Sequence, residues 1–515
     1  LITTTRRINT ATDRNEAVVT RSTQDRWQLS RRSFLATSIA AGAAIAACGR
    51  STLPASPNST SLEAAVKSAE AARPHTGRTV TASLTPQPVT VDLGGPVVRT
   101  LAYGDSIPGP LIRANVGDEL AVAVSNRLAH PTSIHWHGIA LRNDMDGAEP
   151  ATPKIDAGRD FTYRFSVPHS GTYWAHPHTG LDADFGLYAP VIVDDPREAG
   201  RYDAEWIVVL DDWTDGVGRS PQDIYDSLHH GMSGMGGMGM SGVGTSSFLG
   251  GDAGDVHYPY YLVNGRIPAA PTTFTAKPGQ RIRIRFINAG SDTAFRVALA
   301  GHSMTVTHTD GYPILPKEVD ALLLGMSERY DVIVTAGDGV FPLVALAEGK
   351  NAVGRAMLAT GLGTAPDPSF QPVELNRRVG TVDMFTSTPQ AGLGITGADV
   401  NLSADLSGGM MRYDWAINGR PFPDNQPLTI AQGQKATLTF TNRTMMWHPM
   451  HLHGHTFQML DASGGLGARK DSTIVLPMRT VTVALVADNP GIWMMHCHNT
   501  YHQEAGMMTS LNYTA

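Results

Sequence analysis

The sequence predicts an all-β protein made of three tandem Greek-key β-sandwich domains. Only 17% of the residues are charged, while 53 glycines and 33 prolines supply many turns. One short pattern occurs three times at intervals of roughly 155–160 residues, and each copy contains a run that alternates in strand fashion. A chain of 515 residues also exceeds the size of one ordinary hydrophobic core. These observations together favour several β domains in a row.

The repeated pattern is a glycine turn, an alternating strand and an asparagine nine residues after the glycine. The turns are Gly117-Asp118, Gly279-Gln280 and Gly433-Gln434, the strands cover 120–124, 282–286 and 436–440, and the asparagines are Asn126, Asn288 and Asn442. Proline-containing stretches at 195–196 and 366–368 are typical of linkers. We therefore expect domains at 76–200, 201–368 and 369–515.

Residues 1–47 have the features of a twin-arginine signal peptide. Arg31-Arg32 precedes the apolar run 36–47, which is shorter than the roughly 20 residues that a membrane-spanning helix needs. The run ends at Cys48, in a pattern that resembles a bacterial lipobox; the alternative is a simple cleavage site. Because Cys48 is one of only two cysteines, we favour lipidation. This predicts export by the twin-arginine route to the cell envelope or periplasm, with a lipid anchor on the outer face of the cytoplasmic membrane.

Residues 48–75 are expected to tether the anchor to the domains. The part up to residue 60 is rich in Ser, Pro, Thr and Asn, which is typical of a linker. Thr60 and Glu63 have the spacing of a capping box and predict a short helix from Thr60 to about Ala72.

The second cysteine stands in a pattern that predicts metal binding. Cys497 lies between His496 and His498, and His502 and Met507 follow. On a strand, the two flanking imidazoles point to one face and the thiol to the other, so the segment could serve two metal sites. Cys497, His502 and Met507 supply a thiolate, an imidazole and an axial thioether, which are most of a blue-copper centre. Such a centre still needs a second histidine.

Further histidines recur in the first and third domains with the same two-residue spacing. These pairs are His135 and His137, His176 and His178, and His451 and His453, with His448 just before the last pair. One such pair is weak evidence, but with His496 and His498 there are four. The second domain has His302 and His308 but no such pair. We expect the pairs to enclose metals between the outer domains, with the second domain as a spacer.

With these four motifs, residues 76–515 resemble the three-domain, cupredoxin-type multicopper oxidases, which are laccase-like. The chain is most similar to the lipoprotein copper-resistance oxidases of mycobacteria and other actinobacteria. The resemblance implies four copper ions: one type 1, one type 2 and two type 3. It implies type 1 ligands His448, Cys497, His502 and Met507; type 2 ligands His135 and His451; type 3 ligands His137, His176 and His498 for one ion and His178, His453 and His496 for the other.

The resemblance also implies the reaction, in which one-electron oxidation of a reductant is coupled to four-electron reduction of O2 to water. Cys497 is covalently continuous with His496 and His498, which gives electrons a short route between the sites. Asp146 matches a proton-relay acid of bacterial relatives, although an aspartate before a glycine is also a common turn. Relatives often carry a glutamate directly after the last type 1 histidine; here Gln503 stands there, and Glu504 follows as a possible substitute.

The expected electron donor is Cu(I), with Fe(II) and phenols as further donors. A Met-rich tract at 229–244 contains Met232, Met235, Met238 and Met240, and thioethers are soft ligands suited to Cu(I). The alternative is a glycine-rich loop whose methionines have no role. Met446, next to Met445, matches a Cu(I)-binding methionine of relatives, although Thr444 replaces the aspartate that accompanies it there. Met410 and Met411 are further candidates, with packing as the alternative.

Three functions remain to be compared. The leading hypothesis is a cuprous oxidase that serves copper resistance, and the second is a general laccase or ferroxidase. A copper store without turnover is the third, but such a protein is expected to have lost ligands, and all twelve are present. The formal net charge of −7 argues against a nucleic-acid partner.

Overall fold

The computed structural model describes residues 57–514 except 199–200 and 231–242. The predicted signal peptide, Cys48 and the tract methionines Met232, Met235, Met238 and Met240 therefore lie outside the described residues. Helix α2 (Pro57–Ala71) begins three residues before Thr60, so the predicted cap at Thr60 is wrong; proline is favoured in the first turn of a helix. None of the helices in the described residues has the length and apolarity needed to cross a bilayer.

The first domain contains a three-stranded and a four-stranded sheet with a separate hairpin. The three-stranded sheet has the order β1 (Thr79–Leu84), β5 (Glu119–Ser125), β7 (Asp160–Ser166). The four-stranded sheet has the order β4 (Ile112–Asn115), β9 (Ala189–Asp194), β8 (Gly171–His176), β6 (His135–His137). The hairpin is β2 (Pro86–Asp92) with β3 (Val97–Tyr103), and the 3-10 turns are η1 (Asn143–Met145), η2 (Asp182–Asp184) and η3 (Pro196–Glu198).

The second domain has two six-stranded sheets. The first has the order β13 (Tyr260–Val263), β10 (Ala204–Trp213), β15 (Arg281–Asn288), β20 (Arg329–Thr335), β17 (Met304–Thr309), β18 (Tyr312–Val319). The second has the order β14 (Thr273–Thr275), β22 (Ala352–Ala359), β21 (Val340–Ala347), β16 (Phe295–Leu299), β19 (Ala321–Leu324), β23 (Val379–Gly380). The smaller elements are α3 (Pro221–His230), β11 (Thr245–Ser246), β12 (Gly251–Asp252), η4 (Val373–Asn376) and η5 (Val382–Met384).

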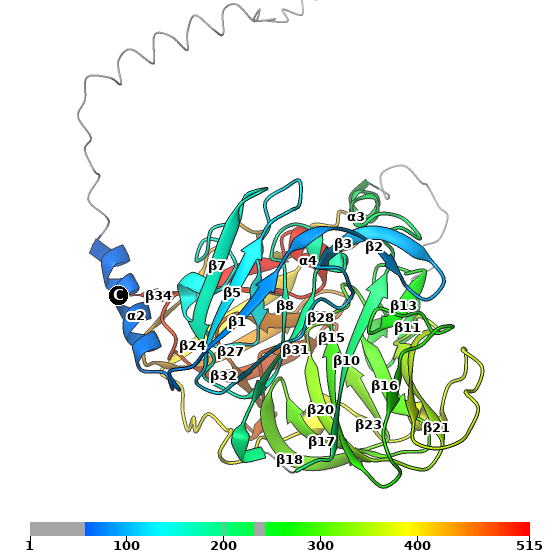
Figure 1. Ribbon diagram of the computed structural model, residues 1–515. Helices are drawn as coiled ribbons and strands as arrows, with labels where there is room; N and C mark the ends of the chain where they lie inside the picture. The colour runs from blue at the N-terminus through cyan, green and yellow to red at the C-terminus, as the bar shows by residue number, and fades with distance from the viewer. Residues whose placement is uncertain (1–56, 199–200, 231–242, 515) are drawn as a thin grey trace, which may run out of the picture. The chain divides into compact units, whose positions relative to one another are not determined.

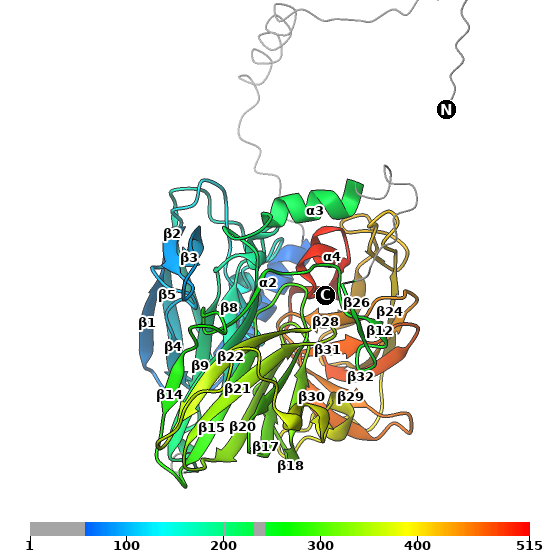
Figure 2. The ribbon, with the colours of Figure 1, turned by 90° about the vertical axis from the view of Figure 1, so that its right-hand side faces the viewer.

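The third domain has a six-stranded and a five-stranded sheet. The six-stranded sheet has the order β25 (Ala416–Ile417), β24 (Val400–Ser407), β27 (Lys435–Asn442), β32 (Thr480–Val486), β29 (Phe457–Leu460), β30 (Leu466–Lys470). The other has the order β26 (Leu428–Ala431), β34 (Met508–Thr514), β33 (Ile492–Cys497), β28 (His448–Leu452), β31 (Ser472–Val475). Helix α4 (Thr500–Glu504) follows β33 and lies beside α3, where the Tyr225 hydroxyl donates to the Glu504 carbonyl at 3.3 Å (Figure 2).

The three domains repeat one strand arrangement, which confirms the predicted fold class. The repeated strands β5, β15 and β27 each pair in parallel with the first strand of their domain, β1, β10 and β24. Each also pairs antiparallel with a later strand, β7, β20 and β32. In Figure 1 the domains follow one another from blue and cyan through green to orange and red. Strand β23 follows residue 368 in the chain but pairs with β19 of the second domain.

The repeated asparagine has the same task in each domain. In the third domain, the Asn442 side chain donates to the carbonyls of Met446, Val475 and Leu476 and accepts from the Thr444 backbone at 2.9 Å. The side chains of Asn126 and Asn288 bind the loops after their own strands in the same way. The asparagine therefore stabilises the loop that follows the repeated strand, because buried carbonyls need donors.

The repeated strand of the second domain differs from the simple alternation that the sequence suggests. The apolar residues of β15 face the core, but Arg283 and Arg285 on its other face are also buried. Their guanidinium groups contact the carboxylate of Asp331 at 2.6 and 3.0 Å, and Arg285 also donates to the Thr172 hydroxyl of the first domain. This face is thus covered by the first domain rather than by solvent.

Candidate metal centre

Two strand pairs, one from the first domain and one from the third, bring the predicted histidines together. Strand β6 pairs with β8 so that His135 stands opposite His176. Strand β28 pairs with β33 so that His451 stands opposite His496. Because alternate residues of a strand point to the same face, each pair presents several imidazoles on one side. The eight histidines of the four predicted pairs form one cluster, in which seven are buried and His178 is partly exposed.

Within the cluster, ring nitrogens face one another at ligand-to-ligand distances. His137 Nδ1 and His498 Nε2 lie 3.4 Å from His176 Nε2. His453 Nε2 and His496 Nε2 are 3.0 Å apart, and His178 completes that group. Metal–nitrogen bonds of about 2.0 Å at a tetrahedral angle separate two ligand nitrogens by about 3.3 Å. The spacing fits shared metal ions.

The protonation state of the cluster also fits metal binding. Burial is the largest cause of a lowered pKa in seven imidazoles of the cluster. The pKa of His496 falls from the ordinary 6.5 to about 4. The pKa falls well below 6.5 in the other six, which are His137, His176, His178, His451, His453 and His498. Neutral rings carry lone pairs that attract a cation. In addition, Nε2 of His135, His178 and His451 is buried without a hydrogen-bond partner. Such atoms are costly unless a ligand satisfies them.

Hydrogen bonds around the cluster determine which nitrogen of each ring faces inward. His135 Nδ1 donates to the Asp146 carbonyl at 3.0 Å, and His451 Nδ1 donates to the Asp471 carbonyl at 2.8 Å. Both rings therefore present Nε2 to the cluster. His137 is reversed, because its Nε2 lies 3.2 Å from Asp471 Oδ1 and its Nδ1 faces His176. Outer partners of this kind fix ring orientation at metal sites.

Asp146 is both a turn residue and a partner of the cluster. Its backbone N–H donates to the Asn143 carbonyl at the end of η1, as expected for a turn. Its buried carboxylate Oδ2 lies 2.8 Å from His453 Nδ1, and Oδ1 has no hydrogen-bond partner. The structure thus brings Asp146 to the cluster. By contrast, Glu504 is exposed at the end of α4, so the structure leaves this acid on the surface rather than at the histidines.

A second group of ligands lies on the other face of β33. Cys497 Sγ is 3.7 Å from His448 Nδ1 and 3.6 Å from His502 Nδ1, and the two nitrogens are 3.1 Å apart. All three residues are buried. Met507 is buried, and its carbonyl accepts from the Cys497 backbone N–H at 3.0 Å, so the two residues are backbone neighbours. Asn499 caps helix α4 by accepting from the backbone of Tyr501 and His502, and this cap positions His502.

The outer edges of both imidazoles in this group are covered. His448 Nε2 lies 2.9 Å from the Thr444 hydroxyl, and His502 Nε2 lies 2.9 Å from Asp255 Oδ2. The Tyr413 hydroxyl donates to the same oxygen of Asp255 at 2.7 Å. The sequence reasoning missed Asp255, because it comes from the second domain and belongs to no motif. In the sequence, Asp255 is marked only by the turn-rich stretch around it, and such stretches are too common to indicate a functional residue.

Three further buried histidines, two of them in the second domain, have other partners. His302 Nε2 accepts from the Gly337 backbone, and His308 lies 3.3 Å from Glu198. His455 lies 2.7 Å from the Tyr513 hydroxyl. Among the described residues of 201–368, none belongs to either of the two ligand groups.

The fold and the two buried ligand groups define a three-domain, cupredoxin-type metalloprotein. Comparison with known families then identifies it. Residues 86–198, 204–362 and 397–515 each match a multicopper oxidase family model. The chain belongs to the multicopper oxidase family, and it is an oxidoreductase that reduces O2.

Similar proteins agree with this family. The chain is 63% identical over 493 residues to the multicopper oxidase MmcO of Mycobacterium tuberculosis, covering 95% of this chain and 97% of that protein. It is 29% identical to a copper resistance protein A homolog of Pseudomonas syringae pv. tomato, covering 81% of this chain and 89% of that protein. Among solved structures, the laccase of Botrytis aclada has a TM-score of 0.68 at 25% identity, covering 86% of this chain and 89% of that one.

Copper loading is expected to raise the thermal stability of the metal-free protein. A metal that binds only the folded chain adds about 4 kcal/mol at a thousandfold excess over its dissociation constant. Calorimetry of metal-free and reloaded protein measures the shift. The variant His302→Gln, outside both groups, should keep the full increase. An unchanged unfolding temperature on copper addition would contradict the fit of these groups to metal.

Proposed function

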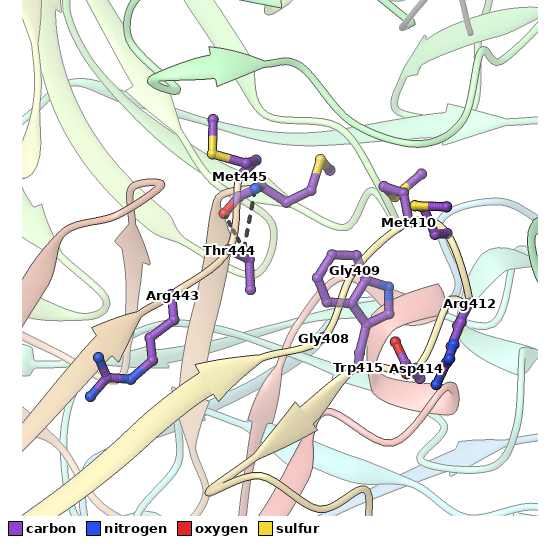
Figure 3. Close-up of a pocket in the computed structure, with 11 residues that line it drawn as sticks. Gly408, Gly409, Met410, Arg412, Asp414, Trp415, Arg443, Thr444 and Met445 are labelled. Atoms are coloured by element: carbon purple, nitrogen blue, oxygen red, sulfur yellow. Dashed lines mark hydrogen bonds between the residues drawn. The ribbon is translucent and has the colours of Figure 1, made fainter.

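We propose that this oxidase takes its electrons from Cu(I) and so serves copper resistance. The observation that carries the proposal is a methionine-lined cavity of about 650 Å³ next to the Cys497 group. Met410, Met411, Met445 and Met446 line it together with Trp415. Figure 3 shows Met445 and Met410 on opposite sides of the cavity, with Trp415 between them. Thioethers are soft ligands that favour Cu(I).

The cavity is connected to the Cys497 group through residues that contact both. Thr444 lines the cavity, and its hydroxyl lies 2.9 Å from His448 Nε2. The Trp415 indole also lines it, and its ring centroid is 4.2 Å from that of His502. An electron from an ion in the cavity therefore has short routes to the thiolate centre. Met411 and Met445 are 79% and 75% exposed, so solvent ions reach the cavity mouth.

The covered imidazole edges favour a small ion over a phenol. Because Nε2 of His448 and of His502 already contact Thr444 and Asp255, neither ring N–H is free to donate a hydrogen bond to a phenol oxygen. Fe(II) is harder than Cu(I) and favours oxygen and nitrogen ligands, whereas the cavity offers four thioethers beside the single carboxylate of Asp414. A general laccase or ferroxidase remains the second candidate, supported by the fold similarity to a laccase.

We assign the four coppers as the family resemblance implies. One type 1 ion is held by Cys497, His448, His502 and Met507, while the cluster histidines hold one type 2 and two type 3 ions. When bound, the coppers supply the electron storage needed to reduce O2 to water. The chain contributes the covalent link from Cys497 to His496 and His498. The donor atoms of the predicted histidine and cysteine ligands lie in these two groups, and the backbone of Met507 lies beside Cys497. Because a copper store without turnover is expected to have lost ligands, this complete set argues against it.

Asp146 is proposed to hold and pass protons at the cluster. Its Oδ2 lies 2.8 Å from His453 Nδ1, and its Oδ1 lies 3.3 Å from His135 Nδ1 without a hydrogen bond to protein. The tract at 229–244 is a further proposed source of Cu(I), but its methionines lie outside the described residues. Met410, Met411, Met445 and Met446 carry the substrate proposal without it.

Removing the two exposed sulfurs should weaken Cu(I) oxidation selectively. For Met411→Leu combined with Met445→Leu, we expect the KM for Cu(I) to rise about tenfold, equivalent to about 1.4 kcal/mol of binding. Turnover of a bulky phenol should change less than about twofold, because leucine keeps the apolar volume. Steady-state kinetics on both substrates measure this. Met478→Leu, at an exposed methionine outside the cavity, is the control; equal losses on both substrates would refute the cavity as the Cu(I) site.

Asp146→Asn should slow oxygen reduction without affecting electron entry. Loss of a positioned proton donor typically costs about 100-fold or more in rate. We expect kcat to fall by about that factor, while anaerobic bleaching of the blue band by Cu(I) keeps its wild-type rate. Asp144→Asn, at an exposed neighbour paired with Arg142, is the matched control. Wild-type kcat in Asp146→Asn would contradict the role.

We also propose that the protein is exported and anchored through a lipid on Cys48. The sequence pattern at 31–48 supports this proposal. In cells that produce Cys48→Ser, we expect the oxidase to move from the membrane fraction to the soluble fraction of the envelope. Immunoblots of both fractions test it. An unchanged membrane share would argue against lipidation.

A further inference from the structure

Arg329, at the start of β20, is a buried arginine of the second domain that contacts all three domains. Its Nε donates to the Thr172 carbonyl of the first domain at 3.1 Å. Nη1 and Nη2 donate to the carbonyls of Ser327 and Asp310 at 3.2 and 3.3 Å. The same two nitrogens donate to Oδ1 and Oδ2 of Asp471 in the third domain at 2.7 and 2.5 Å. All five guanidinium N–H groups therefore have acceptors.

Asp471, the partner of Arg329, contacts two histidines of the cluster. Its Oδ1 lies 3.2 Å from His137 Nε2, and its carbonyl accepts from His451 Nδ1 at 2.8 Å. The two imidazoles are stacked, with centroids 3.8 Å apart and an interplanar angle of 20°. One residue thus sets the orientation of a ring from the first domain and of a ring from the third. It also explains why His137 presents Nδ1 while His451 presents Nε2.

Gly138, directly after His137, leaves room for this ion pair. Its φ is +85°, and a Cβ there would lie 2.2 Å from Arg329 Nη2 and 2.7 Å from Asp471 Oδ2. Both contacts are shorter than real Cβ atoms show. Glycine is therefore required at position 138 for two reasons: its φ is positive, and the approach of Arg329 leaves no room for a Cβ.

From these contacts we infer that Arg329 positions the type 2 and type 3 copper ligands through Asp471. The bidentate pair fixes the plane of the carboxylate, which then fixes the tautomer and tilt of His137 and the backbone that receives His451. The second domain supplies no ligand from its described residues, yet it acts on the cluster through this guanidinium. The proposal gives this domain a role at the cluster beyond that of the expected spacer. The inference rests on the copper assignment proposed above.

The second domain offers a matched comparison for Arg329. Arg285 is equally buried and also joins the first domain, through the Thr172 hydroxyl at 3.0 Å. Its carboxylate partners are Glu205 and Asp331 rather than Asp471. A purely structural role predicts similar effects for both arginines. A positioning role predicts that only Arg329 affects the copper ions.

The test uses copper-loaded full-length protein carrying Arg329→Lys or Arg285→Lys. Lysine keeps the charge but cannot form the bidentate pair. For Arg329→Lys we expect the type 2 copper to be lost to a chelator at about 10- to 100-fold lower chelator concentration than in wild type. Its electron paramagnetic resonance spectrum should also change, while the blue band stays. Arg285→Lys should retain wild-type copper.

Two results would overturn the inference. One is type 2 copper retention within about twofold of wild type, with an unchanged spectrum, in Arg329→Lys. The other is an equal loss in Arg285→Lys. If Arg329→Lys does not fold, Gly138→Ala displaces the same pair from the other side and must show the same selective loss. A wild-type protein without type 2 copper would overturn the copper assignment as well, whereas failure of Cu(I) kinetics alone would leave this inference standing.

Discussion

The structure depends on one constraint, which is that neutral imidazoles with inward lone pairs are packed close together in the protein interior. His453 Nε2 and His496 Nε2 face each other at 3.0 Å, and burial keeps both rings uncharged at neutral pH. A bound metal ion relieves such an arrangement by accepting the lone pairs. The outer acceptors, the burial and the meeting of two domains all follow from the need to hold these rings in place.

Strand geometry connects the two ligand groups. Because β33 alternates its side chains, Cys497 points to one group while His496 points to the other. The thiolate centre lies beside the methionine cavity, and the cluster lies between the first and third domains. Electron entry and oxygen reduction are thus separated in space but joined through a few covalent bonds. This arrangement suits a donor that never enters the cluster.

The sequence was sufficient for the parts that depend on local periodicity. The four histidine pairs could be predicted because a strand has a period of two, and the fold class because one pattern recurs three times. Asp255, Arg329 and Asp471 could not, since they act across domain boundaries and their spacing carries no signal. The burial of Arg285 under the first domain likewise has no signal in its strand, which alternates as an exposed one would. Glu504, considered as a substitute for the acid missing at Gln503, lies on the surface.

The proposed function depends on the oxidation of Cu(I) at the methionine cavity beside the Cys497 group. Crystals of the copper-loaded protein soaked in Ag(I), which has the same charge and softness as Cu(I), test this most directly. We expect anomalous density within bonding distance of the sulfurs of Met445, Met446 and the methionines at 410–411. Silver bound elsewhere, with this cavity empty at saturating Ag(I), would contradict it.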